Sequence, residues 1–213
     1  MGLRSGLQAI GFLLFISVSS VTIAQETEIY TNELKHYRRG LELYDKEKYS
    51  AAFNAFELAL ENMQEPSGMA YEEATYHKAL CALHLFNRDA EYLLKEFIKH
   101  YPESPRVKNA YFQLGRYNYR QKQWEEVVLY LSELDPYDLT PEERAEYYFK
   151  KGYAQFREEN YTEAKRDLYQ LIDVPGTYHA PANYYYGHIA YEDGNYETAL
   201  KSFTKLKTDE KFS

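Results

Sequence analysis

A fixed set of spacings recurs along this sequence of 213 residues. In residues 147–171, the small residue Gly152 precedes the aromatic Phe156 by four positions and a second small residue, Ala164, by twelve. Small residues lack bulk where two helices cross, and apolar residues three and four positions apart line one side of a helix. The pattern therefore predicts two short helices packed as a hairpin, which needs neighbours to bury its apolar face.

The same template begins again at Gly40, Gly115 and Gly187, each 12 residues before a small or apolar residue of the second helix. A fifth copy is incomplete, with Ala90 in its second helix and Lys78 in place of the glycine. The second-helix positions 52, 90, 127, 164 and 199 are then 38, 37, 37 and 35 residues apart, which indicates a repeat array. The predicted anchors of the array are Gly40, Ala52, Phe56, Ala90, Gly115, Trp124, Gly152, Ala164, Gly187, Ala199 and Phe203.

This pattern resembles the tetratricopeptide repeat (TPR), in which a bulky residue, Leu-Gly, Tyr, and then Ala, Phe and Pro recur about every 34 residues. The third repeat carries Tyr111, Leu114 and Gly115, and the first carries Ala52 and Phe56, at matching positions. The resemblance implies an all-α fold, a TPR α-solenoid of about five helix-turn-helix repeats in a right-handed superhelix. It covers residues 33–207, in repeats at about 33–66, 70–102, 105–138, 141–175 and 180–207.

Two features mark where the predicted repeats begin and end. Thr140, Pro141 and Glu143 form a capping-box pattern that predicts the start of a helix, and Ser104 with Pro105 predicts another. After Leu206 no polar capping helix follows, although solenoids normally end in one. Residues 208–213 are therefore interpreted as a truncated or uncapped C-terminus, either because the chain is part of a longer array or because the last face packs on another copy.

The first residues have the pattern of a secretory signal peptide. Arg4 precedes an apolar run from Leu7 to Val21, and small residues occupy the places before a cleavage site after Ala24. We expect residues 1–24 to be removed and residues 25–32 to form a short leader. An uncleaved anchor is the alternative, because Leu7 to Ala24 is just long enough to span a bilayer.

The junction at residues 101–115 is similar to those of exported TPR proteins of Gram-negative bacteria. Two such groups are the lipoprotein of the outer-membrane β-barrel assembly machinery and the periplasmic coordinator of the Tol-Pal system. The resemblance implies a location in the periplasm or at the outer membrane. The chain lacks the lipid-anchor cysteine of the first group and the trimerising coiled coil of the second. The matching residues are Tyr101, Pro102, Ser104, Pro105, Ala110, Leu114 and Gly115.

Composition and motifs limit the classes of function. The net charge of −8 without a basic block argues against nucleic acid as a partner. Glu73, His77, Cys81 and His84 share one helical stripe, but repeat packing explains them better than zinc does, so no metal is expected. No catalytic or phosphate-binding motif occurs, which predicts a protein that is not an enzyme and needs no cofactor.

The remaining candidate site is a surface. In TPR arrays the first helices line a concave groove, and the resemblance places there the residues three before, one after and four after each small anchor. Arg116, Tyr153 and His188 are the preferred partner-binding residues, because about half of the others are expected to be partly buried between helices. The further groove residues are Tyr37, Phe112, Phe149 and Tyr184.

These observations predict a non-catalytic scaffold of the bacterial cell envelope that binds a peptide or protein of unknown identity in its groove. Any association with a membrane would be indirect or through an uncleaved N-terminal segment. One alternative is a component of an outer-membrane or envelope assembly or division machine. Another is glycan or small-ligand binding on an aromatic groove, because aromatic rings also stack on sugars.

Overall fold

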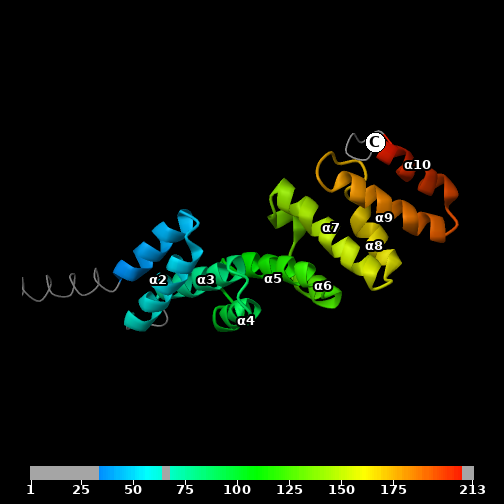
Figure 1. The fold of residues 1–213 in the computed structure, drawn as a ribbon. Helices are drawn as coiled ribbons and strands as arrows, with labels where there is room; N and C mark the ends of the chain where they lie inside the picture. The colour runs from blue at the N-terminus through cyan, green and yellow to red at the C-terminus, as the bar shows by residue number, and fades with distance from the viewer. Residues whose placement is uncertain (1–33, 64–67, 208–213) are drawn as a thin grey trace, which may run out of the picture. The chain divides into compact units, whose positions relative to one another are not determined.

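The structure is a computed structural model that describes residues 34–63 and 68–207 (Figure 1). The predicted signal peptide, residues 1–24, the leader, 25–32, and the predicted C-terminal segment, 208–213, lie outside these ranges. Every regular element in the described residues is helical, which confirms the all-α prediction.

The described helices follow one another as antiparallel pairs joined by short turns. Residues 34–45 form the first described helix. The others are α2 (Tyr49–Asn62), α3 (Met69–His84), α4 (Ala90–His100), α5 (Val107–Gln121), α6 (Trp124–Ser132), the 3-10 helix η1 (Pro136–Asp138), α7 (Pro141–Arg157), α8 (Tyr161–Tyr169), α9 (His179–Glu192) and α10 (Tyr196–Lys207).

These helices make five hairpins in the described residues, divided between two compact units. Hairpin 1 (residues 34–62) and hairpin 2 (α3 and α4) belong to unit 1, Met1–Tyr101. Hairpins 3 (α5 and α6), 4 (α7 and α8) and 5 (α9 and α10) belong to unit 2, Pro102–Ser213. Within each unit the second helix of one hairpin packs on the first helix of the next, which is the arrangement of a TPR solenoid (Figure 1).

The glycine anchors lie where the two helices of a hairpin cross. A Cβ atom on Gly40 would lie 2.5 Å from Phe56 Cε1, and one on Gly187 would lie 2.9 Å from Phe203 Cε1. A Cβ atom on Gly152 would be equally close to its neighbour, 2.9 Å from Leu168 Cγ. The predicted equivalence of these glycines is therefore confirmed, since each meets the residue 16 positions later.

Hairpin 2 reaches the same packing through a different residue. In hairpins 4 and 5, the residues five before and two after the glycine pack into the core, as Ala182 and Ile189 do around Gly187. In hairpin 2 the corresponding core pair is Ala74 and Cys81, which stand five before and two after Ala79. Ala79 is 1% exposed, whereas Lys78 extends to Glu57 of α2, 2.9 Å from Nζ to Oε1. The small residue of this hairpin is thus Ala79, one position after the place that the sequence spacing indicated.

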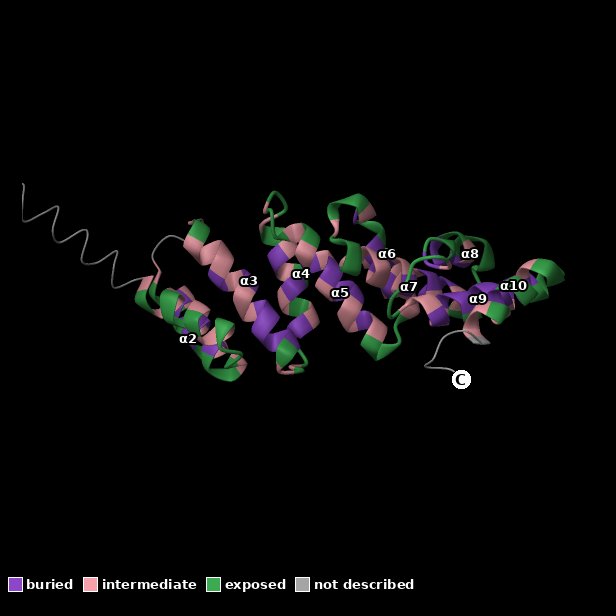
Figure 2. Ribbon diagram, turned by 90° about the horizontal axis from the view of Figure 1, so that it is seen from above, coloured by how far each residue is buried: buried purple, intermediate pink, exposed green. Residues whose placement is uncertain are grey.

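Buried apolar clusters occupy the space between successive hairpins of a unit. In unit 1, Ala52 and Phe56 pack against Ala74 and Cys81. Cys81 is a free thiol without exposed surface, and burial raises its pKa to about 12. The other anchors are buried as well, except Trp124 and Phe203, which are half-buried. Figure 2 shows the result in unit 2, where α9 is largely buried and α10 carries exposed residues.

The starts of α5 and α7 differ. Thr140 Oγ1 accepts a hydrogen bond from Glu143 N, 3.3 Å, while Glu143 Oε2 accepts one from Thr140 N, 3.2 Å, so the predicted capping box is present. Ser104 Oγ accepts from Arg106 N, 3.1 Å, but this closes a turn before the helix, and α5 begins only at Val107. The predicted start at Pro105 is therefore two residues early.

Candidate functional site

One carboxylate joins the first helices of hairpins 3 and 4. Arg116 Nε and Nη2 of α5 donate to the two oxygens of Glu146 on α7, at 2.8 and 2.6 Å, and Lys150 Nζ lies 2.8 Å from Glu146 Oε1. Burial opposes ionisation of Glu146, but the hydrogen bonds from Arg116 and Lys150 outweigh it and lower the pKa of this carboxyl. Glu146 is therefore a fixed negative charge between two cations.

Aromatic rings continue from this ion-pair group along three first helices. The ring centroids of Tyr119 and Tyr153 are 5.7 Å apart, and those of Tyr153 and Tyr185 are 4.9 Å apart. Burial, followed by the neighbouring Tyr153, raises the pKa of Tyr185 to about 12, and burial also raises the pKa of Tyr119. The phenols of Tyr119 and Tyr185 therefore stay neutral at physiological pH and keep their hydroxyl protons.

Cations lie over these rings. Lys150 Nζ is 4.9 Å from the centre of the Tyr119 ring. Arg157, at the end of α7, has its guanidinium 5.2 Å from the Trp124 ring and donates from Nη1 to Tyr153 Oη at 3.2 Å. Such contacts fix the long cationic side chains beside the rings without enclosing them.

At the α9 end, His188 packs edge-on against Phe156, with ring centroids 5.6 Å apart. Its Nδ1 atom is buried and makes no hydrogen bond within the part of the chain that the structure describes. We define the first-helix face as the side chains from α5, α7 and α9 that share this surface. They are Arg116, Tyr119, Lys150, Tyr153, Arg157, Tyr185 and His188.

The structure divides the predicted groove residues into three groups. The preferred residues Arg116, Tyr153 and His188 are all half-buried members of the first-helix face. Phe112 and Phe149 are only 1% and 8% exposed, because they pack beneath this face in the core of unit 2. These two were assigned to the binding surface incorrectly, since a buried ring offers little area to a partner.

The last two predicted groove residues lie elsewhere. Tyr37 belongs to unit 1, where its ring is 6.4 Å from that of Phe56 and is half-buried. Tyr184 is 48% exposed and lies toward α10, 6.4 Å from the Phe203 ring. Tyr184 also lies edge-on to Tyr185, with ring centroids 5.1 Å apart, so it adjoins the α9 end of the first-helix face.

Sequence reasoning missed Glu146, Lys150, Arg157 and Tyr185. Lys150 and Arg157 lie one turn either side of Tyr153 on α7, so a search of the stripe around each predicted residue would have found them. Glu146 lies 30 residues from Arg116, less than one repeat, which is a separation that brings neighbouring first helices together.

The four residues of the possible metal stripe are engaged in packing. His77 Nδ1 lies 2.8 Å from the Glu73 carbonyl oxygen, and the His84 ring stacks on Tyr49 at 3.9 Å. Across residues 34–63 and 68–207, no group of three or more His, Cys, Asp or Glu side chains could hold a metal ion. In the same ranges no helix has the length and apolar character needed to cross a membrane.

The fold and the first-helix face together define a helix-hairpin repeat protein whose first helices carry a surface of aromatic and cationic side chains. Residues 149–210, which begin within α7 and include α8, α9 and α10, match the family model described as tetratricopeptide repeat. This part of the chain therefore matches the tetratricopeptide repeat, as the sequence pattern predicted, and the other described hairpins share the same fold.

Solved structures support the same fold. The structure of MamA AMB-1 aligns with a TM-score of 0.66 at 16% identity, over 86% of this chain and 94% of that one. MamA MSR-1 aligns with a TM-score of 0.63 at 17% identity, over 85% and 99%. A further crystal structure of MamA gives 0.59 at 20% identity, over 81% and 95%. At these identities the likeness concerns the fold. A search of curated proteins found no match to the sequence.

Proposed function

We propose that this protein is a non-catalytic scaffold that binds a peptide or protein partner through the first-helix face. The observation that carries the proposal is the continuous row of tyrosines and cations on α5, α7 and α9, held in place by Glu146 and by ring contacts. Tyrosine and arginine contribute much of the energy of protein interfaces, because they combine large contact area with directional hydrogen bonds. Rigid placement reduces the entropy that such side chains lose on binding.

The charges of the face favour a partner segment with carboxylates. Arg116, Lys150 and Arg157 bring three positive charges to it, and the Glu146 carboxylate offsets one of them. The whole chain carries a net charge of −8, so the face differs in sign from the chain as a whole. An extended or helical segment with acidic and aromatic residues would complement it.

The proposal includes a location in the bacterial cell envelope, at the periplasm or outer membrane. It is supported by the signal-peptide pattern of residues 1–24 and by the resemblance of the 101–115 junction to exported TPR proteins. Expression in a Gram-negative host, fractionation and N-terminal sequencing test it. A periplasmic chain that begins at Gln25 is expected, whereas a cytoplasmic chain that keeps Met1 would contradict it.

Binding is tested by a pull-down from an envelope extract with the chain of residues 25–213. The test variant combines Arg157→Glu and His188→Ala, because Arg157 is exposed on α7 and His188 is the member of the face at its α9 end. Arg116 is left unchanged, since its loss would leave the half-buried Glu146 carboxylate with only its contact to Lys150. The matched control is Arg166→Glu, the same charge change at an exposed arginine of α8.

A partner captured by the parent and the control, and lost by the test variant, would support the proposal. Equal capture by all three chains would place the interface elsewhere and refute this use of the face. Co-purification with outer-membrane assembly or division proteins would indicate the narrower role of a machine component.

Glycan binding has less support from the contacts. A sugar stacks on an open aromatic face, but the Trp124 ring carries the Arg157 guanidinium and meets the edges of Tyr119 and Tyr153 at 5.6 and 5.3 Å. Quenching of Trp124 fluorescence by oligosaccharides, and not by peptides, would reverse this assessment.

A further inference from the structure

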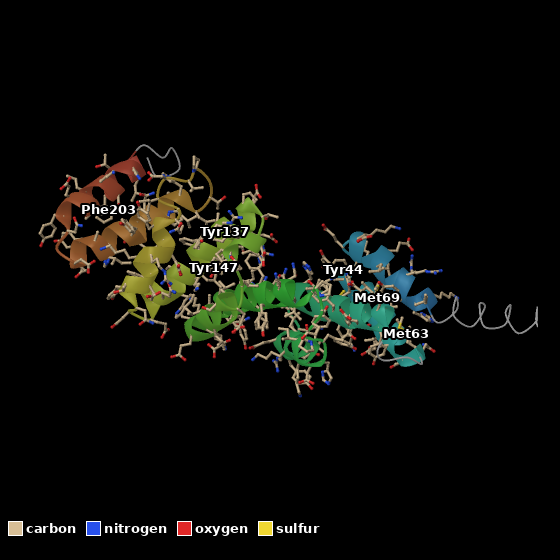
Figure 3. All side chains as sticks on the ribbon, turned by 180° about the vertical axis from the view of Figure 1, so that it is seen from behind. Tyr44, Met63, Met69, Tyr137, Tyr147 and Phe203 are labelled. Carbon is tan, nitrogen blue, oxygen red and sulfur yellow. The ribbon has the colours of Figure 1, made fainter. Side chains whose placement is uncertain are left out.

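The outer side of hairpin 5 carries apolar residues in the register of a repeat interface. We call this the terminal stacking surface and define it by four residues of α9 and α10. Tyr184 is 48% exposed and Leu200 is 69% exposed, while Phe203 and Leu206 are half-buried. Figure 3 marks Phe203 at its place on α10. The members of the surface are Tyr184, Leu200, Phe203 and Leu206.

The same register is covered one repeat earlier. Thirty-five residues before Tyr184, Phe203 and Leu206 lie Phe149, Leu168 and Leu171, the shift that separates Gly152 from Gly187. Those three residues are 8%, 0% and 2% exposed. Their cover is α9, which contributes Ala182, Tyr186 and Ile189 to the shared cluster.

Hairpin 3 repeats the arrangement. Phe112, Leu131 and Leu134 are 1%, 1% and 6% exposed, and α7 covers them with Tyr147 and Ala154. Tyr147 and Ala154 stand five before and two after Gly152, as Ala182 and Ile189 stand around Gly187. In both hairpins 3 and 4 such a surface is thus covered by an amphipathic helix with core residues seven positions apart.

We propose that the terminal stacking surface binds an amphipathic helix of a partner protein, in the way that α9 packs on hairpin 4. This helix carries a small residue, an aromatic residue four positions later and an aliphatic residue seven positions later, the pattern of Ala182, Tyr186 and Ile189. The surface continues the interface that already holds unit 2 together, so its shape and apolar character match such a helix. It shares no residue with the first-helix face, although Tyr184 contacts Tyr185 of that face, and it does not depend on the function proposed there.

One substitution within the repeat specifies the partner further. In hairpin 4 the register of Leu200 is occupied by Lys165, whose Nζ lies 2.7 Å from Asp193 Oδ2 at the end of α9. In hairpin 5 the lysine is replaced by leucine. A helix that docks there therefore meets an apolar side chain where α9 meets a cation, and an apolar residue eleven positions after its small residue would bind best.

The test uses two synthetic peptides of residues 178–195, stapled as helices on the side away from Ala182, Tyr186 and Ile189. One peptide keeps Asp193 and the other carries Asp193→Leu. Binding of each to the whole chain is measured by isothermal titration calorimetry. The Asp193→Leu peptide is expected to bind about tenfold more tightly, because burying one leucine side chain is worth roughly that factor.

The variant Leu200→Lys is expected to reverse this preference, since it restores the charge pair seen between Lys165 and Asp193. Leu200→Glu is expected to weaken both peptides by about tenfold or more, since a carboxylate replaces the apolar contact and would also repel Asp193 of the parent peptide. The matched control is Leu129→Glu on α6, which also changes an exposed leucine but lies outside the surface and is expected to bind like the parent.

Absence of binding by both peptides would overturn the proposal, as would an unchanged preference in Leu200→Lys. Sedimentation of the parent and of Leu200→Glu completes the test. The chain could instead self-associate in a way that Leu200→Glu abolishes and the peptides do not inhibit. That result would assign the surface to a second copy of this chain and not to a partner helix.

Discussion

Asp167 and Glu146 are carboxylates of unit 2 whose surroundings move their pKa values in opposite directions. Asp167 is 5% exposed, and burial raises its pKa although Lys151, Arg166 and Gln155 partly oppose this effect. Glu146 is held by Arg116 and Lys150, which overcome burial and lower its pKa. The two groups therefore give opposite dependences of stability on pH.

Asp167→Asn is expected to raise the melting temperature at pH 7.5 by about 2–4 °C, equivalent to about 1 kcal/mol. The raised pKa means that the folded chain binds the proton more tightly, so the parent loses stability as pH rises above about 4, the usual pKa of the unfolded group. The introduced amide can donate to Gln155 Oε1, which has no hydrogen-bond partner among the described residues. Calorimetric melting from pH 3.5 to 8 checks this, and an equal gain at every pH would contradict it.

Glu146→Gln is expected to lower the free energy of unfolding at pH 7 by about 1–3 kcal/mol, because Arg116 and Lys150 lose their shared charged acceptor. A lowered pKa gives stability that is present above about pH 4.3 and is lost as pH falls through the folded-state value. Urea unfolding at several pH values measures the loss. Glu142→Gln, an exposed change in the same helix, is the control and should leave stability nearly unchanged.

At this scale the sequence predicted the face only in part. Arg116, Tyr153 and His188 were found because they stand one position after each glycine, where the first-helix face lies. Phe112 and Phe149 stand three positions before a glycine, which is slightly less than one helical turn. Their side chains therefore point nearly the same way as the glycine, into the core. The Glu146 contact depends on the distance between two hairpins, which no local pattern specifies.

The hairpin is the element that the glycine spacing determines most directly. Gly152→Ala is expected to destabilise unit 2 by about 1–3 kcal/mol, despite the higher helix propensity of alanine, because its Cβ would stand 2.9 Å from Leu168 Cγ and 3.3 Å from Asp167 Cβ. Urea unfolding measures the loss. In the double variant with Leu168→Ala the two costs should not add, since the smaller side chain removes the clash. Strict additivity would show that the close approach is not the cause.

Capping supplies a second test at this scale. Thr140→Ala is expected to cost about 1 kcal/mol, because it removes the acceptor for Glu143 N at the start of α7. Thr140→Ser keeps that acceptor and should restore most of the stability. Thermal unfolding followed by circular dichroism measures both, and an equal loss in both variants would exclude the capping bond as the reason.

Local chemistry explains which helix starts could be predicted. The capping box of α7 lies within four adjacent residues, so the sequence contains all of it. The true position of the small residue in hairpin 2 could not be found in this way, because Lys78 and Ala79 differ by one position and the choice depends on Lys78 reaching Glu57 in the preceding hairpin.

Hairpins 3 to 5 contain two hydrophobic clusters formed entirely by their own residues, one around Phe112 and Leu131 and one around Phe149 and Leu168. A fragment of residues 102–213 is therefore expected to fold alone with a cooperative thermal transition. The fragment 25–101, with two hairpins, is expected to be marginal, since about three repeats are needed for a stable stack. Circular dichroism and urea unfolding of both fragments check this, and a stable 25–101 beside an unfolded 102–213 would contradict it.

The repeat spacing predicted the number and type of hairpins, but it could not predict a division of the chain after Tyr101. The template treats every junction alike, and the residues 101–105 offer the same proline and serine signals as an ordinary boundary. Such a division is a property of the packed structure that no single repeat position specifies.

The buried thiol of Cys81 is a natural probe of local unfolding in unit 1. With a pKa of about 12 and no exposed surface, the sulfur cannot react with an alkylating reagent while unit 1 is closed. Every modified molecule therefore records one opening event of hairpins 1 and 2, and no other cysteine in the sequence contributes to the signal. The rate of thiol labelling thus measures how often unit 1 opens, without an engineered probe.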